Sequence, residues 1–324
     1  MRRLFSTLLP ALLAGGMLAT AHAQDAPYPS KTVSLVVPFP PGGVVDVIGR
    51  LIAARMQKEL KGTIVVENKP GAGGTLGAGL VARARPDGYT LLLGGSATHV
   101  FGPAIYPKLN YQPSELVPIG QISNGPLVVV VGSSSRATDM PSLLAELRAA
   151  GGSANFASNG NGTFPQLAGE LFNQANQLTP VHVPYNGGPA VITALMRGDV
   201  SFSINHIPVV QGMVRSGRLR AIATTGAKRA AALPDLPTVA ETGQKGFEAN
   251  AWFGLFVPAG TPPAVQKVLS DALAASLEDK ELRDKLLAQG DEATYRSSGE
   301  FGAYIADETA KWVPIIKASK ISVD

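Results

Sequence analysis

Six small polar residues in a row are the first feature of the sequence that could do chemistry: Ser158-Asn159-Gly160-Asn161-Gly162-Thr163. Hydroxyls, amides and glycine N–H groups of this kind can hold an anion without a cationic side chain. Thr163 and Gln166 fit the T-x-x-Q capping box, which predicts that a helix begins here and that the preceding amides and hydroxyls point outward. We therefore expect a ligand contact at this loop; the alternative is a flexible turn with an ordinary cap.

A second loop, Phe39-Pro40-Pro41-Gly42-Gly43, precedes a helical pattern and offers a similar anion site. Its glycines let backbone N–H groups approach a ligand closely, and a helix N-terminus adds partial positive charge. Asp46 lies in the first turn of that helix, where we expect a local partner for free N–H groups rather than a catalytic acid. We include this loop and Asp46 in the candidate ligand site.

Two further loops supply small polar groups. The sequence Tyr185-Asn186-Gly187-Gly188-Pro189 predicts a helix start with Gly188 as the N-cap, and its tyrosine is either a lid or a packing residue. The loop Gly94-Gly95-Ser96-Ala97-Thr98 adds two hydroxyls after another apolar run. From these loops we add to the candidate site Ser96, Thr98, Tyr185 and Gly188.

Another glycine cluster, 71–77, is only superficially like a nucleotide-binding loop. Leu76 occupies the position of the last glycine of G-x-G-x-x-G, and the Gly-Lys-Ser/Thr ending of a P-loop is absent. We interpret the cluster as a place of close helix packing.

Residues that would indicate an enzyme are sparse. The sequence lacks the G-x-S-x-G, H-E-x-x-H and Ser-x-x-Lys patterns of common hydrolases, and it contains no cysteine. His99, His182 and His206 stand far apart, so neither a metal cluster nor a general base has local support. We expect no enzyme activity, cofactor or metal, and keep as an alternative an ester or amide hydrolase with Ser96 or Ser158 as its nucleophile.

Apolar runs alternate with helix-period segments along the chain, which predicts parallel α/β sheets. In the first part we expect strands at 32–37, 64–66 and 89–93 and helices at 44–60 and 75–84. In the second we expect a helix at 141–150 and strands at 127–131, 155–157, 181–183, 200–204 and 219–223. One more strand, 252–257, precedes a mostly helical stretch from 263 to 319. Since ligands bind at the carboxyl ends of parallel strands, these elements put the four polar loops at binding edges.

Length and composition favour a folded protein of two lobes. The chain has 324 residues, 45% of them hydrophobic and 16% charged. Lys and Arg number 28 against 24 Asp and Glu, an excess too small and scattered for nucleic-acid binding. We expect one lobe to contain residues 24–124 plus 250–324 and the other 125–249, with a two-strand hinge near Asn124 and Asn250.

The N-terminus predicts export. Arg2 and Arg3 precede an apolar stretch, and Ala21-His22-Ala23 matches an A-x-A cleavage site. We expect residues 1–23 to be a signal peptide cleaved after Ala23, because the apolar run is shorter than the ~20 residues that cross a bilayer. The mature protein is then expected in the periplasm, in soluble form.

Taken in order, stretches of this sequence resemble the extracytoplasmic receptors of the tripartite tricarboxylate transporters, called the Bug family. The resemblance covers Tyr28 to Pro262 and rests on eight stretches, which are Tyr28–Lys31, Pro38–Gly43 with Asp46, Glu67–Gly74, Pro86–Thr90, Pro184–Tyr185 with Gly187–Gly188, Gly198–Asp199, Leu233–Glu241, and Trp252–Gly254 with Pro258–Pro262. Each stretch alone is weak, whereas eight in family order make a strong match.

The resemblance implies a two-lobed, type II-like periplasmic binding protein whose lobes are mostly parallel sheets flanked by helices. It implies that a small carboxylate is captured by hinge closure and delivered to the membrane subunits of a transporter. In this family the carboxylate is held by backbone amides, small hydroxyls and water, and the matching residues here are 39–43 and 158–163. We expect a monomer without affinity for nucleic acid; a sensory receptor is the alternative role.

One position departs from the family pattern. Many relatives carry an acidic residue after the fourth strand of the second lobe, where this chain reads Ile204-Asn205-His206. An aspartate there could pair with a ligand ammonium, whereas neutral Asn205 can donate a hydrogen bond. We therefore expect Asn205 to contact the ligand and to favour carboxylates without an ammonium group, such as di- or aromatic carboxylates. A pocket role for His206 stays open.

Overall fold

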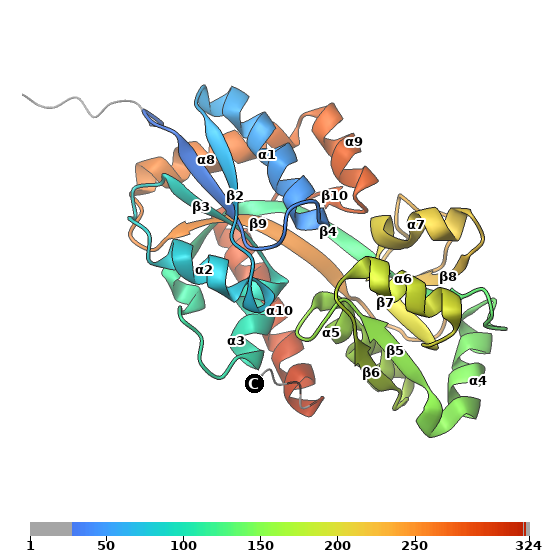
Figure 1. The fold of residues 1–324 in the computed structure, drawn as a ribbon. Coiled ribbons are helices and arrows are strands. Elements are labelled where there is room, and N and C mark those ends of the chain that lie inside the picture. Colours follow the sequence, from blue (N-terminus) through green and yellow to red (C-terminus); the bar gives the residue numbers. More distant parts are fainter. Residues whose placement is uncertain (1–27, 320, 322–324) are drawn as a thin grey trace, which may run out of the picture.

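The fold is taken from a computed structural model in which residues 28–319 and 321 are described. Within this part of the chain, ten strands form a curled, mixed sheet flanked by helices (Figure 1). The long strand β4 (Leu116–Gly132) belongs to both lobes, which confirms the predicted two-lobed α/β class. The predicted signal peptide, 1–23, lies outside the described residues.

The first lobe has the strand order β2-β1-β3-β9-β4. Its first three strands are parallel, and β9 runs antiparallel to both β3 and β4. The strand bounds are β1 (Val33–Val37), β2 (Ile64–Asn68), β3 (Thr90–Gly95) and β9 (Asn250–Pro258). Helices cover both sides (Figure 1), and their bounds are α1 (Val44–Leu60), α8 (Pro263–Leu277) and α9 (Lys280–Ala288) on one side, and α2 (Thr75–Ala82), α3 (Gly102–Ile105) and α10 (Ser298–Ala318) on the other.

The second lobe has the order β4-β7-β5-β6, with β8 paired to the other edge of β4. Its bounds are β5 (Asn155–Ser158), β6 (Val181–Pro184), β7 (Phe202–His206), β8 (Leu219–Thr224), α4 (Met140–Ala150), α5 (Phe164–Asn176), α6 (Gly188–Arg197) and α7 (Ile207–Arg215). All five residues of 127–131 are fully buried, because the sheet has helices on both faces. Val129 and Val131 pack toward α4 and α5, whereas Val128 and Val130 pack toward α6 and α7.

Two strand expectations require correction. The predicted strand 127–131 is only the end of β4, because its first half contains Pro118, Gly120 and polar residues that interrupt the apolar pattern. The stretch from 263 to 319, expected to be mostly helical, also contains a strand that was not predicted. The short strand β10 (Glu292–Ala293) pairs with Ser123 and Asn124 of β4, where β4 passes between the lobes. The predicted helix at 44–60 is confirmed.

A buried aromatic cluster joins the two lobes. Phe164, the first residue of α5, stacks on Phe101 of the π-helical turn η2 (Ala97–Phe101), with ring centroids 5.4 Å apart. Phe164 also meets Trp312 of α10 edge-on at 5.6 Å. Phe101 and Trp312 are fully buried and Phe164 is 6% exposed. The hydrophobic core is therefore continuous between the lobes, and it fixes the start of α5 against the first lobe.

We expect Phe164→Ala to lower the free energy of unfolding by about 3–5 kcal/mol, the usual cost of emptying a buried phenylalanine site. Because the lost ring joins two lobes, we also expect a larger radius of gyration in small-angle X-ray scattering. Phe247→Ala is the matched control, since Phe247 is also 6% exposed but packs on Phe172 within the second lobe. An unchanged radius in Phe164→Ala would contradict the joining role.

Candidate ligand-binding site

Contacts in the first lobe bring two of the polar loops together, and a contact across the lobes places a third beside the first lobe. Phe39 and Thr98, from the loops after β1 and β3, both lie against Gly74. A Cβ on Gly74 would come within 3.1 and 3.2 Å of their side chains. Across the lobes, a Cβ on Gly162 would lie 3.8 Å from Cδ1 of Ile105. The β1–α1 and β3–η2 loops therefore meet at Gly74, and the β5–α5 loop lies beside α3 of the first lobe.

The glycines of the 71–77 cluster pack closely, as predicted. A Cβ on Gly77 would lie 2.8 Å from both the Lys69 carbonyl oxygen and Cβ of Pro38. Gly74 has φ +96°, a left-handed conformation that favours glycine. The cluster therefore lets α2 approach the loop that follows β1.

Asp46 organises the loop after β1. Its Oδ2 accepts hydrogen bonds from Gly42 N–H at 2.9 Å and from Arg50 Nε at 3.0 Å, and its Oδ1 accepts one from Asn68 Nδ2 at 2.9 Å. Burial opposes ionisation, yet the bonds from Arg50, Gly42 and Asn68 outweigh it and hold the pKa of Asp46 below its usual range. These contacts confirm Asp46 as a local partner. Residues 40–43 remain exposed, with the first-turn amides of α1 beside them.

The loop after β3 uses one of its two hydroxyls internally. Thr98 is fully buried, and its Oγ1 accepts from Gly95 N–H at 3.0 Å and lies 2.9 Å from Nδ1 of His99. Ser96 is 5% exposed, and its hydroxyl has no hydrogen bond within residues 28–319. Thr98 therefore shapes the loop, whereas Ser96 can offer a hydroxyl to a ligand.

The hydroxyls of the loop after β5 turn inward. Ser158 Oγ donates to the Gly160 carbonyl oxygen at 3.0 Å, and Thr163 Oγ1 donates to the same oxygen at 2.7 Å. Thr163 is the N-cap of α5, but the predicted capping box does not form, because Gln166 Oε1 accepts from Gly162 N–H at 2.7 Å instead. The expectation of outward hydroxyls is therefore wrong. The φ of +128° at Gly160 belongs to a conformation that L side chains rarely adopt.

Sequence reasoning missed the contact of His182 with this loop and assigned Gln166 a different role. Nε2 of His182 lies 2.7 Å from Oγ of Ser158, and Nδ1 of His182 lies 3.2 Å from Nε2 of Gln166. His182 seemed isolated because 24 residues separate it from Ser158. The signal that could have found it is the parallel pairing of β5 with β6, which sets Phe156 opposite His182, but residue periodicity does not reveal that register.

The loop after β6 differs from its prediction by one residue. Gly187, not Gly188, is the N-cap of α6, and Gly188 is the first helical residue. A Cβ on Gly188 would lie 2.4 Å from Cγ1 of Val209, so close packing of α6 on α7 requires glycine there. Tyr185 packs against the second-lobe core, which matches the packing alternative.

Asn159 and Asn205 form a reciprocal amide pair. Asn159 Nδ2 donates to Asn205 Oδ1 at 3.1 Å, and Asn205 Nδ2 donates to Asn159 Oδ1 at 2.9 Å. Asn205 Oδ1 also accepts from His206 N–H at 2.9 Å, and Asn205 is fully buried. Asn205 therefore holds the half-buried side chain of Asn159 at the end of β5, and it influences the candidate site through that residue.

The electrostatics of these loops come from the backbone. In the part of the chain that the structure describes, Arg50 is the one cation hydrogen-bonded to a candidate residue, and Asp46 balances its charge. Burial lowers the pKa of His182 and His206 to about 4 and that of His99 to about 3, so all three are neutral at pH 7. Helices α1, α5 and α6 begin at these loops, and the first amides of a helix attract anions.

No group of three His, Asp or Glu residues that could hold a metal occurs within 28–319. Two surface hollows, of about 610 and 190 Å³, have no candidate residue in their walls. The larger is lined by residues 232–236 together with parts of α7 and β8.

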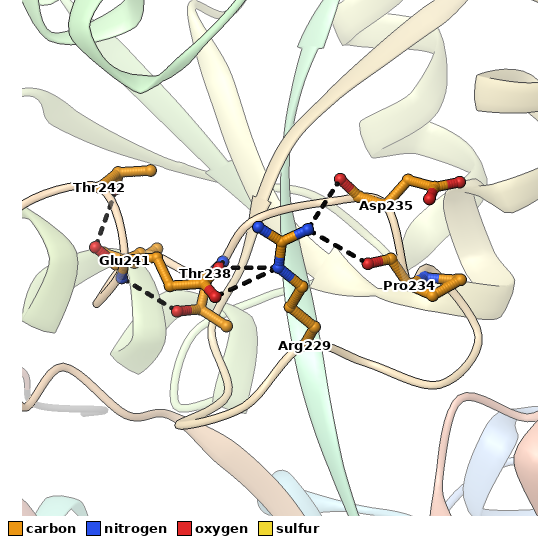
Figure 2. Close-up of polar contacts among 7 residues, drawn as sticks. Arg229, Pro234, Asp235, Thr238, Glu241 and Thr242 are labelled. Carbon is orange, nitrogen blue, oxygen red and sulfur yellow. Dashed lines mark hydrogen bonds and ion pairs between the residues drawn. The ribbon is translucent and has the colours of Figure 1, made fainter.

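The stretch Leu233–Glu241, which carries part of the family resemblance, is held by Arg229 (Figure 2). Arg229 Nε donates to the two carboxylate oxygens of Glu241 at 3.0 and 3.2 Å, and its Nη1 donates to the carbonyl oxygens of Pro234 and Asp235 at 3.4 and 3.5 Å. Thr238 N–H donates to Glu241 at 2.8 Å. With Arg229, it holds the pKa of that carboxyl below its usual range. These contacts give the stretch a structural role, because they fix the conformation of the loop.

Comparisons with known proteins find similar chains over most of this sequence. Residues 48–321 match the model of a family described as "Tripartite tricarboxylate transporter family receptor". The protein BugT of Bordetella pertussis is 33% identical over 320 residues, which cover 98% of this chain and 97% of BugT.

Two solved structures with carboxylates are similar over most of the chain. Rpa4515 of R. palustris with adipate is 30% identical with a TM-score of 0.83, over 91% of this chain and 100% of that one. MatC of Rhodopseudomonas palustris with bound malate is 31% identical with a TM-score of 0.79, over 89% of this chain and 100% of that one.

We expect Asp46→Asn to destabilise the protein by about 1–3 kcal/mol at pH 7 in urea unfolding, because an amide nitrogen would face one of the donors that now bind carboxylate oxygens. Since folding lowers the pKa of Asp46, its contribution is present above the unfolded pKa of about 3.9 and is lost as the pH falls through the folded value.

The difference between wild type and Asp46→Asn should therefore shrink below about pH 4. Asp271→Asn is the control, since Asp271 pairs only with exposed Lys267 on the surface of α8. Its stability should follow the wild type at every pH. A pH-independent deficit in Asp46→Asn would contradict the role of the ionised carboxylate.

Proposed function

Because this chain belongs to the tripartite tricarboxylate transporter receptor family, we propose that it captures a small carboxylate between its lobes and delivers it to the membrane subunits of such a transporter. The observation that carries the proposal is that α1 of the first lobe and α5 of the second both begin at glycine-containing loops, and that Gly162 lies against the first lobe. Arg50, the described cation bonded to Asp46, is balanced by that carboxylate. Members of this family are solute receptors rather than enzymes. The hydrolase alternative is therefore wrong, although Ser158 and His182 lie within hydrogen-bond distance.

In the proposed site, the carboxylate lies between the β1–α1 and β5–α5 loops. Backbone N–H groups of Gly43 and Asn161 and the hydroxyl of Ser96 are its donors, directly or through water, which can be nearly as favourable as a direct bond. Asp46 and Asn205 hold these loops in place, as the hydrogen bonds of both side chains support. Backbone dipoles then supply the positive electrostatic potential that a cationic side chain would otherwise provide.

Receptors of this family are periplasmic. Among the described residues, no helix combines the length and apolar character needed to cross a membrane. We propose that residues 1–23 are removed after Ala23 and that the receptor acts as a monomer. We also propose that it closes about a hinge near Asn124 and Asn250, where β4 and β9 run side by side.

A thermal-shift screen tests the ligand class. At about 100 times its dissociation constant, a bound ligand should add about 2.7 kcal/mol of stability. We expect shifts with di- or aromatic carboxylates and smaller shifts with aspartate and glutamate, because Asp46, the carboxylate of the proposed site, is buried and already paired with Arg50. A flat response to all acids would overturn the proposed function, and a preference for amino acids would overturn the predicted selectivity.

Asn205→Asp should shift the selectivity toward amino acids. The new oxygen cannot donate to Asn159 Oδ1, so the amide pair is lost. The negative charge behind the half-buried Asn159 then attracts a ligand ammonium and repels a second ligand carboxylate. In calorimetry we expect aspartate to bind about tenfold more tightly and succinate about tenfold more weakly, each about 1.4 kcal/mol. Asn205→Ala is the control, since it breaks the amide pair without adding charge. A gain for aspartate in the alanine variant would count against the charge explanation.

A further inference from the structure

The Gly162 N–H determines the direction of each hydrogen bond in the series that runs from Gln166 through His182 to Ser158. Gly162 N–H can only donate, so the Gln166 atom 2.7 Å away from it is the carbonyl oxygen. The side-chain nitrogen of Gln166 then faces Nδ1 of His182 at 3.2 Å, and an amide nitrogen can only donate. Nδ1 is therefore the acceptor of the ring. Neutral His182 must carry its proton on Nε2.

The Nε2 proton of His182 then determines what the Ser158 hydroxyl does. Nε2–H donates to Ser158 Oγ over 2.7 Å, so the serine proton goes to the Gly160 carbonyl oxygen at 3.0 Å. In a Ser–His hydrolase the proton runs in the opposite direction, from the serine to the imidazole. The same two side chains therefore hold a carbonyl group here rather than activate a nucleophile.

A held carbonyl orients the next amide. The Gly160–Asn161 peptide is trans, so the Asn161 N–H points opposite to the Gly160 C=O. Two hydroxyls, from Ser158 and Thr163, bind that oxygen, and the N–H therefore points away from both of them. Asn161 is exposed, so its N–H is free to meet a ligand at the start of α5.

We propose that Gln166 and His182 are positioning residues, which lock the Nε2–H tautomer and thereby direct the Asn161 N–H at the ligand carboxylate. The ligand part rests on the proposed function, whereas the tautomer can be measured in the ligand-free protein. Neither side chain needs to touch the ligand. Their effect passes through Ser158 and the Gly160 carbonyl.

Gln166→Glu tests this chain of bonds. At pH 8 the ionised carboxylate of this variant can still accept from Gly162 N–H but cannot donate, so Nδ1 of His182 must take the ring proton. Nε2 then accepts the Ser158 proton, and the Gly160 carbonyl loses one of its hydroxyl partners. By ¹⁵N NMR we expect Nε2–H in the wild type and Nδ1–H in the variant. We also expect about tenfold weaker binding of the carboxylate selected by the thermal screen.

Gln174→Glu is the matched control, since Gln174 lies exposed on the same helix and its replacement adds the same charge. It should change neither the tautomer nor the affinity. Nδ1–H in the wild type would overturn the proposal whatever the ligand result, and a switched tautomer with unchanged affinity would overturn the positioning role. If Gln166→Glu does not fold, Ser158→Ala should keep the Nε2–H tautomer and still weaken binding about tenfold; unchanged affinity would again overturn the role.

The proposed function and this inference can fail separately. If the wild type binds no carboxylate, the proposed function fails. The amide ¹⁵N shift of Asn161, which responds to hydrogen bonds on the Gly160 oxygen, then decides the inference. A changed shift in Gln166→Glu, with none in Gln174→Glu, would support the held peptide, whereas an unchanged shift would overturn it.

Discussion

The interaction on which the proposed binding site depends is the attraction between a carboxylate and backbone N–H groups at helix ends. A peptide N–H carries only a partial charge and cannot turn toward its ligand as a lysine can, so its direction must be set before the ligand arrives. Most hydrogen bonds around the two loops serve this purpose. They orient peptide groups rather than reach for the ligand.

The β1–α1 and β5–α5 loops orient their peptide groups in the same way. In each, a side chain in the first turn of the helix accepts from a glycine N–H four residues earlier, Asp46 from Gly42 and Gln166 from Gly162. Both glycines have positive φ, +81° and +73°. The partners differ in charge: the Asp46 carboxylate needs Arg50 to balance it, whereas Gln166 is neutral. The positive electrostatic potential at the two helix N-termini of the proposed anion site is therefore preserved, because neither helix end is left with an unbalanced negative group.

The position of the second loop depends on the core of the first lobe. Phe164 directly follows Thr163, and its ring contacts both Phe101 and Trp312. The residue that starts α5 is therefore also the residue that joins the lobes. A change in the angle between the lobes must move this ring or bend the chain beside it, which would couple the proposed closure to the loop that carries the proposed amide donors.

The sequence by itself determined the α/β class, the bounds of α1, the glycine packing at 71–77 and the polar loops at strand ends, because these follow from local periodicity and turn chemistry. Only the tertiary structure decided which groups in those loops stay free. Strand register and loop folding settled four features that were not predicted. These are the first half of β4, the pairing of β10, the inward hydroxyls of Ser158 and Thr163, and the contact of His182 with Ser158. Register and hydrogen-bond direction are settled by partners distant in the chain, and no local pattern of residue types records them.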